Sequence, residues 1–119
     1  MQEKLFDSEA KVMEIIWTNA PISAKDISLI AAESIGWNKN TTYTVIKKCV
    51  DKGAVERCDP GFICRALVTQ DEARRAEAEA LVERIFGGST ELLFASFLSG
   101  KKLSEEESAR LHRLIEERS

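Results

Sequence analysis

The chain has 119 residues and a mass of 13.3 kDa, which allows one domain or two small units and excludes large barrels and multi-domain enzymes. Its composition, 44% hydrophobic and 31% charged with only 2 Pro and 6 Gly, is typical of a folded helical protein. The formal net charge of -3 lies in the second half: residues 1–68 carry nine basic and nine acidic side chains, and residues 69–119 carry eight and eleven. Apolar runs such as Leu92–Ala95 are far shorter than the about 20 residues that cross a bilayer, so we expect a cytoplasmic protein.

Three helices are predicted in the first half of the chain. Apolar residues recur at helical spacing over 7–17, and Pro21 prevents this helix from continuing. A second helix begins at the Ser23 capping box and ends at Gly36. A third covers 41–52, and its predicted inward side chains are Thr42, Val45, Ile46 and Cys49.

A β-hairpin follows the third helix. Short, partly alternating segments at 54–58 and 62–67 flank Asp59-Pro60-Gly61, a strong turn signal. An isolated hairpin is marginal in water, so it must pack on the helices. This order predicts a mainly α fold with a small β hairpin, a winged helix-turn-helix whose third helix enters the DNA major groove. The alternative is a small α+β protein-interaction module.

The second half is predicted to be helical throughout. A capping box at Thr69 and Glu72 opens a helix through Phe86, the segment 92–98 is apolar on every side, and a last helix starts at the Ser104 capping box. We therefore predict a DNA-binding domain over 1–68 and a helical dimerisation region over 69–119. A second copy would cover apolar side chains that the region cannot bury alone, although they could instead pack back on the first domain. The predicted dimer contacts are Leu81, Ile85, Leu92, Leu93, Phe94, Phe97, Leu98, Leu111 and Leu114.

The outward surface of the third helix carries side chains that suit DNA and has no carboxylate before Asp51. Asn pairs bidentately with adenine, Thr reaches base edges, and Lys suits phosphates. From residue 38 to 65 there are six basic and three acidic residues, a local charge of +3. We expect contacts with DNA bases from Asn40, Thr41, Tyr43 and Thr44. We expect contacts with the DNA phosphate backbone from Lys39, Lys47, Lys48, Arg57 and Arg65. The plainer interpretation is that these side chains only solvate an exposed helix.

The cysteines indicate neither a disulfide framework nor a metal site, because there are three of them without a CxxC pair and one distant His112. No cofactor is expected, and no catalytic constellation indicates an enzyme. Cys58 and Cys64 lie on opposite arms of the predicted hairpin, where oxidation would make a redox-responsive regulator. The alternative is that both are small strand side chains and that Cys49 is a core residue.

Several segments together resemble the penicillinase repressor family of regulators of beta-lactam resistance and copper transport. They are Glu9–Trp17, Trp37 with Thr41–Ile46, Lys52-Gly53, Phe86–Ser89, and Leu92–Phe97 with Leu103-Ser104. Their order and separation cover nearly the whole chain.

The resemblance implies a homodimeric repressor whose winged-helix heads bind a palindromic operator and whose helices from Thr69 onward hold two copies together. It also implies derepression by proteolysis, when a membrane sensor detects an antibiotic. The scissile pair would be Ser96-Phe97, with Ser96 standing where the family usually has Asn. Nothing after Cys64 supplies the cysteine motif of the copper-sensing branch, so copper sensing of that type is not expected.

Overall fold

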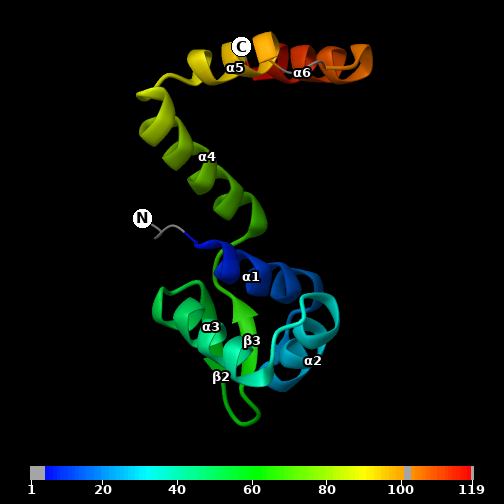
Figure 1. Cartoon of the computed structure of the whole chain (residues 1–119), viewed down its shortest axis with the longest axis vertical. Helices are drawn as coiled ribbons and strands as arrows, with labels where there is room; N and C mark the ends of the chain where they lie inside the picture. The colour runs from blue at the N-terminus through cyan, green and yellow to red at the C-terminus, as the bar shows by residue number, and fades with distance from the viewer. Residues whose placement is uncertain (1–4, 101–102, 119) are drawn as a thin grey trace. The chain divides into compact units, whose positions relative to one another are not determined.

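A computed structural model describes residues 5–100 and 103–118, which form six helices and three short strands (Figure 1). The elements are α1 (Asp7–Asn19), β1 (Ile22–Ser23), α2 (Ala24–Ser34), α3 (Lys39–Asp51), β2 (Val55–Cys58), β3 (Ile63–Ala66), α4 (Gln70–Phe86), α5 (Thr90–Gly100) and α6 (Glu105–Arg118). The chain divides into two compact units, residues 1–80 and 81–119, and the division falls inside α4. The predicted boundary between 68 and 69 precedes α4, and the roles assigned on either side of it stay predictions.

The predicted helices are confirmed, and the third begins two residues earlier than expected. Asn38 caps it, since its side-chain oxygen accepts a 2.8 Å hydrogen bond from the backbone N–H of Thr41. At the other end Lys52 is the C-cap, and Gly53 adopts a φ of 79° that favours glycine. The helix therefore has a defined start and a defined stop.

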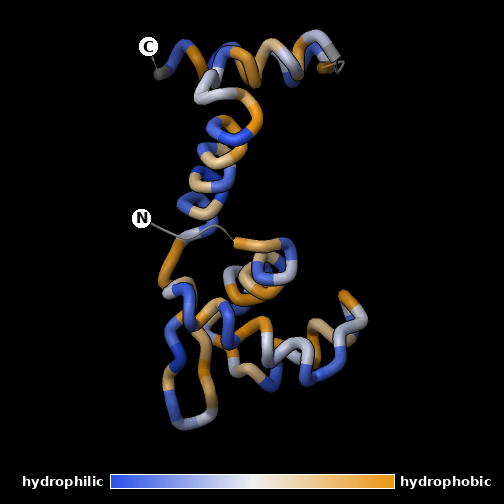
Figure 2. Tube along the Cα trace, turned by 60° about the vertical axis from the view of Figure 1, so that its left-hand side comes forward, coloured by the Kyte–Doolittle hydropathy of each residue, from blue (hydrophilic) through white to orange (hydrophobic). Residues whose placement is uncertain are grey.

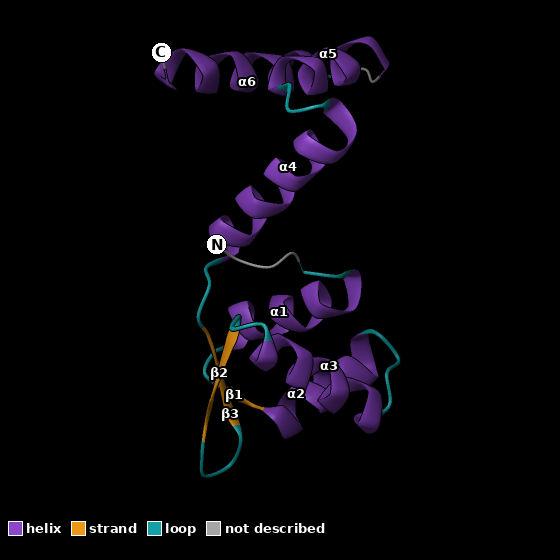
Figure 3. Cartoon of the chain, turned by 90° about the vertical axis from the view of Figure 1, so that its left-hand side faces the viewer, coloured by secondary structure: helices purple, strands orange, loops and turns teal. Residues whose placement is uncertain are grey.

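The sheet has three antiparallel strands in the order β1-β3-β2, one more than the predicted hairpin. The hairpin itself is confirmed, with Val55 opposite Ala66 and Cys58 opposite Ile63. The additional strand β1 is only two residues long and pairs Ile22 with Cys64. Figure 3 shows the strands to one side of α1, α2 and α3, as in a winged helix.

The core of the first unit lies between the three helices and the inner face of the sheet. Its fully buried apolar members are Val12, Met13, Ile16, Ala24, Ile27, Ala31, Ile46, Cys49 and Cys64. The predicted inward set of α3 is confirmed, because Thr42, Val45, Ile46 and Cys49 are all buried. The indole of Trp17 closes the end of this core by donating a 2.9 Å hydrogen bond to the carbonyl of Val68.

Helical spacing alone does not decide which side chains are buried, since Ala10 on α1 and Ser34 on α2 are spaced with the apolar residues of their helices and are exposed. On α1 the buried stripe includes Glu9 and Ile15 instead. Glu9 is a carboxylate, and its burial requires a partner that residue type alone does not indicate.

The unit 81–119 has a different character, because none of its described side chains is fully buried. Figure 2 shows orange, apolar segments recurring along α5 and α6. Large apolar side chains are more than half exposed, among them Ile85, Leu92, Leu98, Leu114 and Ile115. Leu81, Leu93 and Leu111 are half-buried. None of the helices within the described ranges is long and apolar enough to span a membrane.

Candidate nucleic-acid interface

The outward face of α3 is polar and basic over its whole length before Asp51. Its exposed side chains are Lys39, Asn40, Thr41, Thr44, Lys47 and Lys48. Because the opposite face packs into the core, these side chains cannot turn inward without unpacking the helix. The structure thus brings six of the nine predicted DNA-contacting residues onto one surface.

Local hydrogen bonds orient the polar side chains of this face. On the exposed face the hydroxyl of Thr44 donates to the carbonyl of Asn40 at 2.9 Å, and on the buried face that of Thr42 donates to the carbonyl of Asn38 at 3.1 Å. A threonine hydroxyl that donates to its own helix keeps its lone pairs and its methyl group for another partner. Thr44 can therefore still accept a hydrogen bond or contact a thymine methyl group.

Tyr43 differs from the prediction because it is half-buried rather than fully outward. Its ring meets the ring of Phe62 edge-on, with centroids 5.9 Å apart and planes at 84°. The ammonium of Lys39 lies 5.7 Å from the Tyr43 centroid on α3 itself. Tyr43 therefore contacts Phe62 of the β2–β3 wing and lies only partly on the outward face of α3.

Phe62 was not predicted as a functional residue. It follows the Asp59-Pro60-Gly61 turn and has a φ of 49°, which is uncommon for a residue other than glycine. Its carbonyl accepts a 2.9 Å hydrogen bond from the backbone N–H of Ala24, the first residue of α2. An aromatic residue directly after a tight turn was the only signal in the sequence.

Arg57, on β2, lies over the ring of Phe62. Its guanidinium carbon lies 3.7 Å from the centroid of the Phe62 ring, and its Nε donates to the Asp59 carboxylate at 3.2 Å. Both charged side chains are about half exposed. The predicted wing cation is therefore held in place and paired with a carboxylate.

Lys52 is one of the six basic residues counted between 38 and 65, but it is not on the outward face of α3. Its Nζ lies 2.6 Å from Oε1 of Glu9, a carboxylate that is 1% exposed. Burial opposes ionisation of Glu9, but hydrogen bonds from Lys52 and from the backbone of Phe6, together with the charges of Lys52 and Lys48, lower its pKa. Lys52 thus neutralises a buried charge, and the basic surface of α3 consists of Lys39, Lys47 and Lys48.

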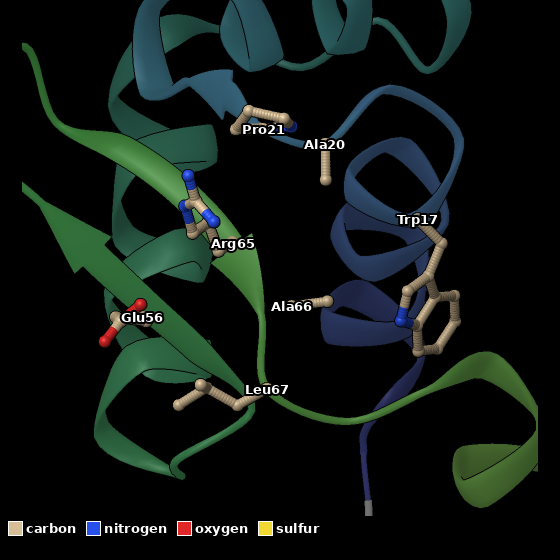
Figure 4. A pocket seen from close by; sticks show the side chains of 7 residues that line it. All are labelled: Trp17, Ala20, Pro21, Glu56, Arg65, Ala66 and Leu67. Atoms are coloured by element: carbon tan, nitrogen blue, oxygen red, sulfur yellow. The ribbon is translucent and has the colours of Figure 1, made fainter.

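Arg65 lies apart from α3. Cys64, its neighbour in β3, points into the core, so alternation places Arg65 on the outer face of the sheet opposite Glu56. There it lines a shallow hollow of about 450 Å³ that Trp17 and Pro21 also border (Figure 4). Of the predicted backbone-contacting residues, Arg65 is the one that the structure does not bring near the others.

The cysteines do not form the pair that a redox switch would need. Cys58 lies opposite Ile63 and Cys64 opposite Arg57, so Cys58 and Cys64 point to opposite faces of the hairpin. All three thiols are free. Burial raises the pKa of Cys64 to about 11 and that of Cys49 to about 12, which leaves both as unreactive thiols. Among the residues that the structure describes, no cluster of His, Cys, Asp and Glu could hold a metal ion.

The predicted cleavage pair lies within α5. Ser96 and Phe97 are both exposed, and Phe97 retains 50% of its accessible surface. The predicted dimer contacts in α5 and α6 are exposed or half-buried in the single chain, and their role in dimerisation stays a prediction.

Comparisons with known proteins agree on one family. Residues 5–117 match the family model described as Penicillinase repressor. The chain is 22% identical over 116 residues to the penicillinase repressor of Bacillus licheniformis, covering 96% of this chain and 91% of that protein. It is 23% identical over 114 residues to the methicillin resistance regulatory protein MecI of Mammaliicoccus sciuri, covering 94% and 93%.

A solved structure has a similar fold. The solution structure of the DNA-binding domain of the repressor BlaI superposes with a TM-score of 0.55 and 21% identity, covering 60% of this chain and 93% of that one. This likeness confirms the winged-helix fold.

Proposed function

Because the chain belongs to the penicillinase repressor family, a family of transcriptional repressors, we propose that it represses genes as a homodimer bound to a palindromic operator. The observation that carries the proposal is the carboxylate-free outer face of α3, from Lys39 to Lys48, on a helix fixed by the winged-helix core. Each copy inserts this helix into the major groove of one half-site.

Base reading is assigned to the middle and start of α3. Asn40 suits adenine, and Thr41 and Thr44 present hydroxyl and methyl groups to base edges. Tyr43 contributes its exposed part. Lys39, Lys47, Lys48 and Arg57 hold phosphates, and Arg65 is a peripheral contact at most, since it lies on the outer face of the sheet.

Dimerisation is assigned to the helices after Thr69. Burial of a leucine or phenylalanine side chain contributes about 1.5 to 3 kcal/mol, and α5 and α6 expose several of them. A single head with a few phosphate contacts binds weakly, whereas two linked heads bind two half-sites with a high effective concentration. The apolar helices therefore supply the avidity of the repressor.

Derepression is assigned to cleavage between Ser96 and Phe97. The cut removes the last four residues of α5 together with α6 and so removes part of the apolar surface that would join two copies. Intact mass measured before and after exposure of the host cells to a beta-lactam tests this step, and an unchanged mass contradicts it. A membrane-bound sensor protease is the proposed partner.

The central experiment is a DNA titration with a duplex from the promoter upstream of the chain's own gene and a scrambled duplex of equal length. We expect preference for the promoter and an affinity that falls with salt in proportion to the phosphates neutralised. Equal binding of the two duplexes contradicts sequence-specific repression, and a salt-independent response contradicts the basic face of α3.

A further inference from the structure

Four side chains form a continuous row from α3 to the β2–β3 wing. Lys39 lies over the Tyr43 ring, Tyr43 meets Phe62 edge-on, and Phe62 carries the Arg57 guanidinium on its face. We name this row, Lys39-Tyr43-Phe62-Arg57, the aromatic bridge. It has a cation at each end, one on α3 and one on β2.

We propose that Phe62 is a positioning residue for DNA binding, which fixes the wing cation Arg57 relative to the helix cation Lys39 without touching DNA itself. The inference rests on the proposed function of α3 and the wing as a DNA-binding surface. It assigns to Phe62 a role in setting the spacing of the phosphate contacts.

The contact with Asp59 indicates how Arg57 would hold a phosphate. A guanidinium over an aromatic ring keeps N–H donors at its periphery, and these suit carboxylate and phosphate oxygens alike. Arg57 already makes such a contact, since its Nε donates to Asp59 at 3.2 Å while its carbon lies 3.7 Å from the Phe62 centroid. Arg57 can therefore bind an anion without leaving the ring.

Phe62 is itself held firmly enough to position another side chain. Its carbonyl is bonded to the start of α2, its ring packs against the buried core, and its φ of 49° is kept by these surroundings. A long cation that is already ordered loses less side-chain entropy when it binds a phosphate. Loss of the ring would release Arg57 and remove that advantage.

The test is a double-mutant cycle in the full chain, with Phe62→Leu, Phe62→Tyr and Arg57→Ala. Binding to a labelled mixed-sequence duplex of about 30 base pairs is measured by fluorescence anisotropy at several salt concentrations. We expect Arg57→Ala to weaken binding about fivefold and to reduce the salt slope by about one in the wild-type and Phe62→Tyr backgrounds. In the Phe62→Leu background the same substitution should cost less than about twofold. An equal cost in all three backgrounds overturns the inference.

A measurement without DNA separates this inference from the proposed function. The side-chain protons of Arg57 should show an upfield ring-current shift by NMR in the wild type and in Phe62→Tyr, and should lose it in Phe62→Leu. Absence of the shift in the wild type overturns the inference. A wild-type chain that shows the shift but binds no duplex at low salt overturns both the proposed function and the inference, whereas additive substitutions in a chain that binds overturn the inference alone. Circular dichroism checks folding, and Phe62→Met repeats the comparison if Phe62→Leu lowers the folded fraction.

Discussion

The buried carboxylate of Glu9, in the first turn of α1, accepts a 2.6 Å hydrogen bond from Lys52, the C-cap of α3. The same oxygen accepts a 2.8 Å hydrogen bond from the backbone N–H of Phe6, and Lys52 lies 4.1 Å from the Phe6 ring centroid. One ion pair at the edge of the core thus joins the start of α1 to the end of α3.

Lys52→Met should destabilise the chain at pH 7, because it leaves the Glu9 carboxylate buried without its cation. We expect a loss of about 3 kcal/mol in the free energy of unfolding, measured with urea. Lys47→Met, on the exposed face of α3, is the control and should change stability by less than about 0.5 kcal/mol. Similar losses for the two variants would contradict a stabilising role of the pair.

The same pair should make stability depend on acid. The pKa of Glu9 is lower in the folded chain than its ordinary value of 4.5, so its stabilisation is present above that value and is lost as pH falls through the folded pKa. Glu9→Gln has no such titration, and the stability difference between wild type and Glu9→Gln should shrink as the pH is lowered below 4.5. A difference that stays constant with pH would show that Glu9 acts by packing alone.

Asp59→Asn should strengthen DNA binding, because it removes the carboxylate that competes with phosphate for Arg57. We expect a gain of about threefold at low salt that disappears as salt screens the charges. Asp71→Asn on α4 changes the net charge equally and serves as the control, since Asp71 pairs with Arg74 rather than with a wing cation. An equal gain in both variants would point to net charge rather than to release of Arg57.

Thr44→Ala and Lys48→Ala should affect DNA binding in different ways. Loss of the Thr44 hydroxyl and methyl should reduce the preference for the promoter duplex over a scrambled one, while loss of the Lys48 charge should weaken both about equally and lower the salt slope by about one. Paired titrations with the two duplexes measure these ratios. The reverse pattern would refute the division between base-reading and phosphate-binding residues.

Leu98→Ser should weaken self-association, because Leu98 is 61% exposed in the single chain and is a proposed dimer contact. Sedimentation velocity should show a larger monomer fraction at micromolar concentration. Leu29→Ser is a matched control, since Leu29 is 59% exposed but lies on α2 in the other unit. A wild-type chain that sediments as a monomer, or equal effects of the two variants, would contradict the proposed dimer.

The helices could be predicted from the sequence because each has a start and stop that depend on neighbouring residues. The capping box at Thr69 is an example: the hydroxyl of Thr69 accepts from the backbone of Glu72, and the Glu72 carboxylate accepts from the backbone of Thr69. Such capping signals lie within three or four consecutive residues, so they can be recognised from the sequence alone.

The parts that could not be predicted depend on contacts between distant residues. Strand β1 is too short to show a pattern and exists because Ile22 reaches Cys64, 42 positions later. The pairing of Lys52 with Glu9 spans 43 positions and changes the number of cations that face outward. The register of β3 decides on which face of the sheet Arg65 lies. The residue type alone does not determine that face.

The buried apolar cluster of the first unit takes its members from residues 12–68. The winged-helix part therefore takes its hydrophobic stabilisation from its own residues and not from α5 or α6. Under the proposed function, substitutions in α5 and α6 can therefore change the signal for derepression and leave the fold of the DNA-binding part intact, so that operator recognition and the inducing signal can evolve separately.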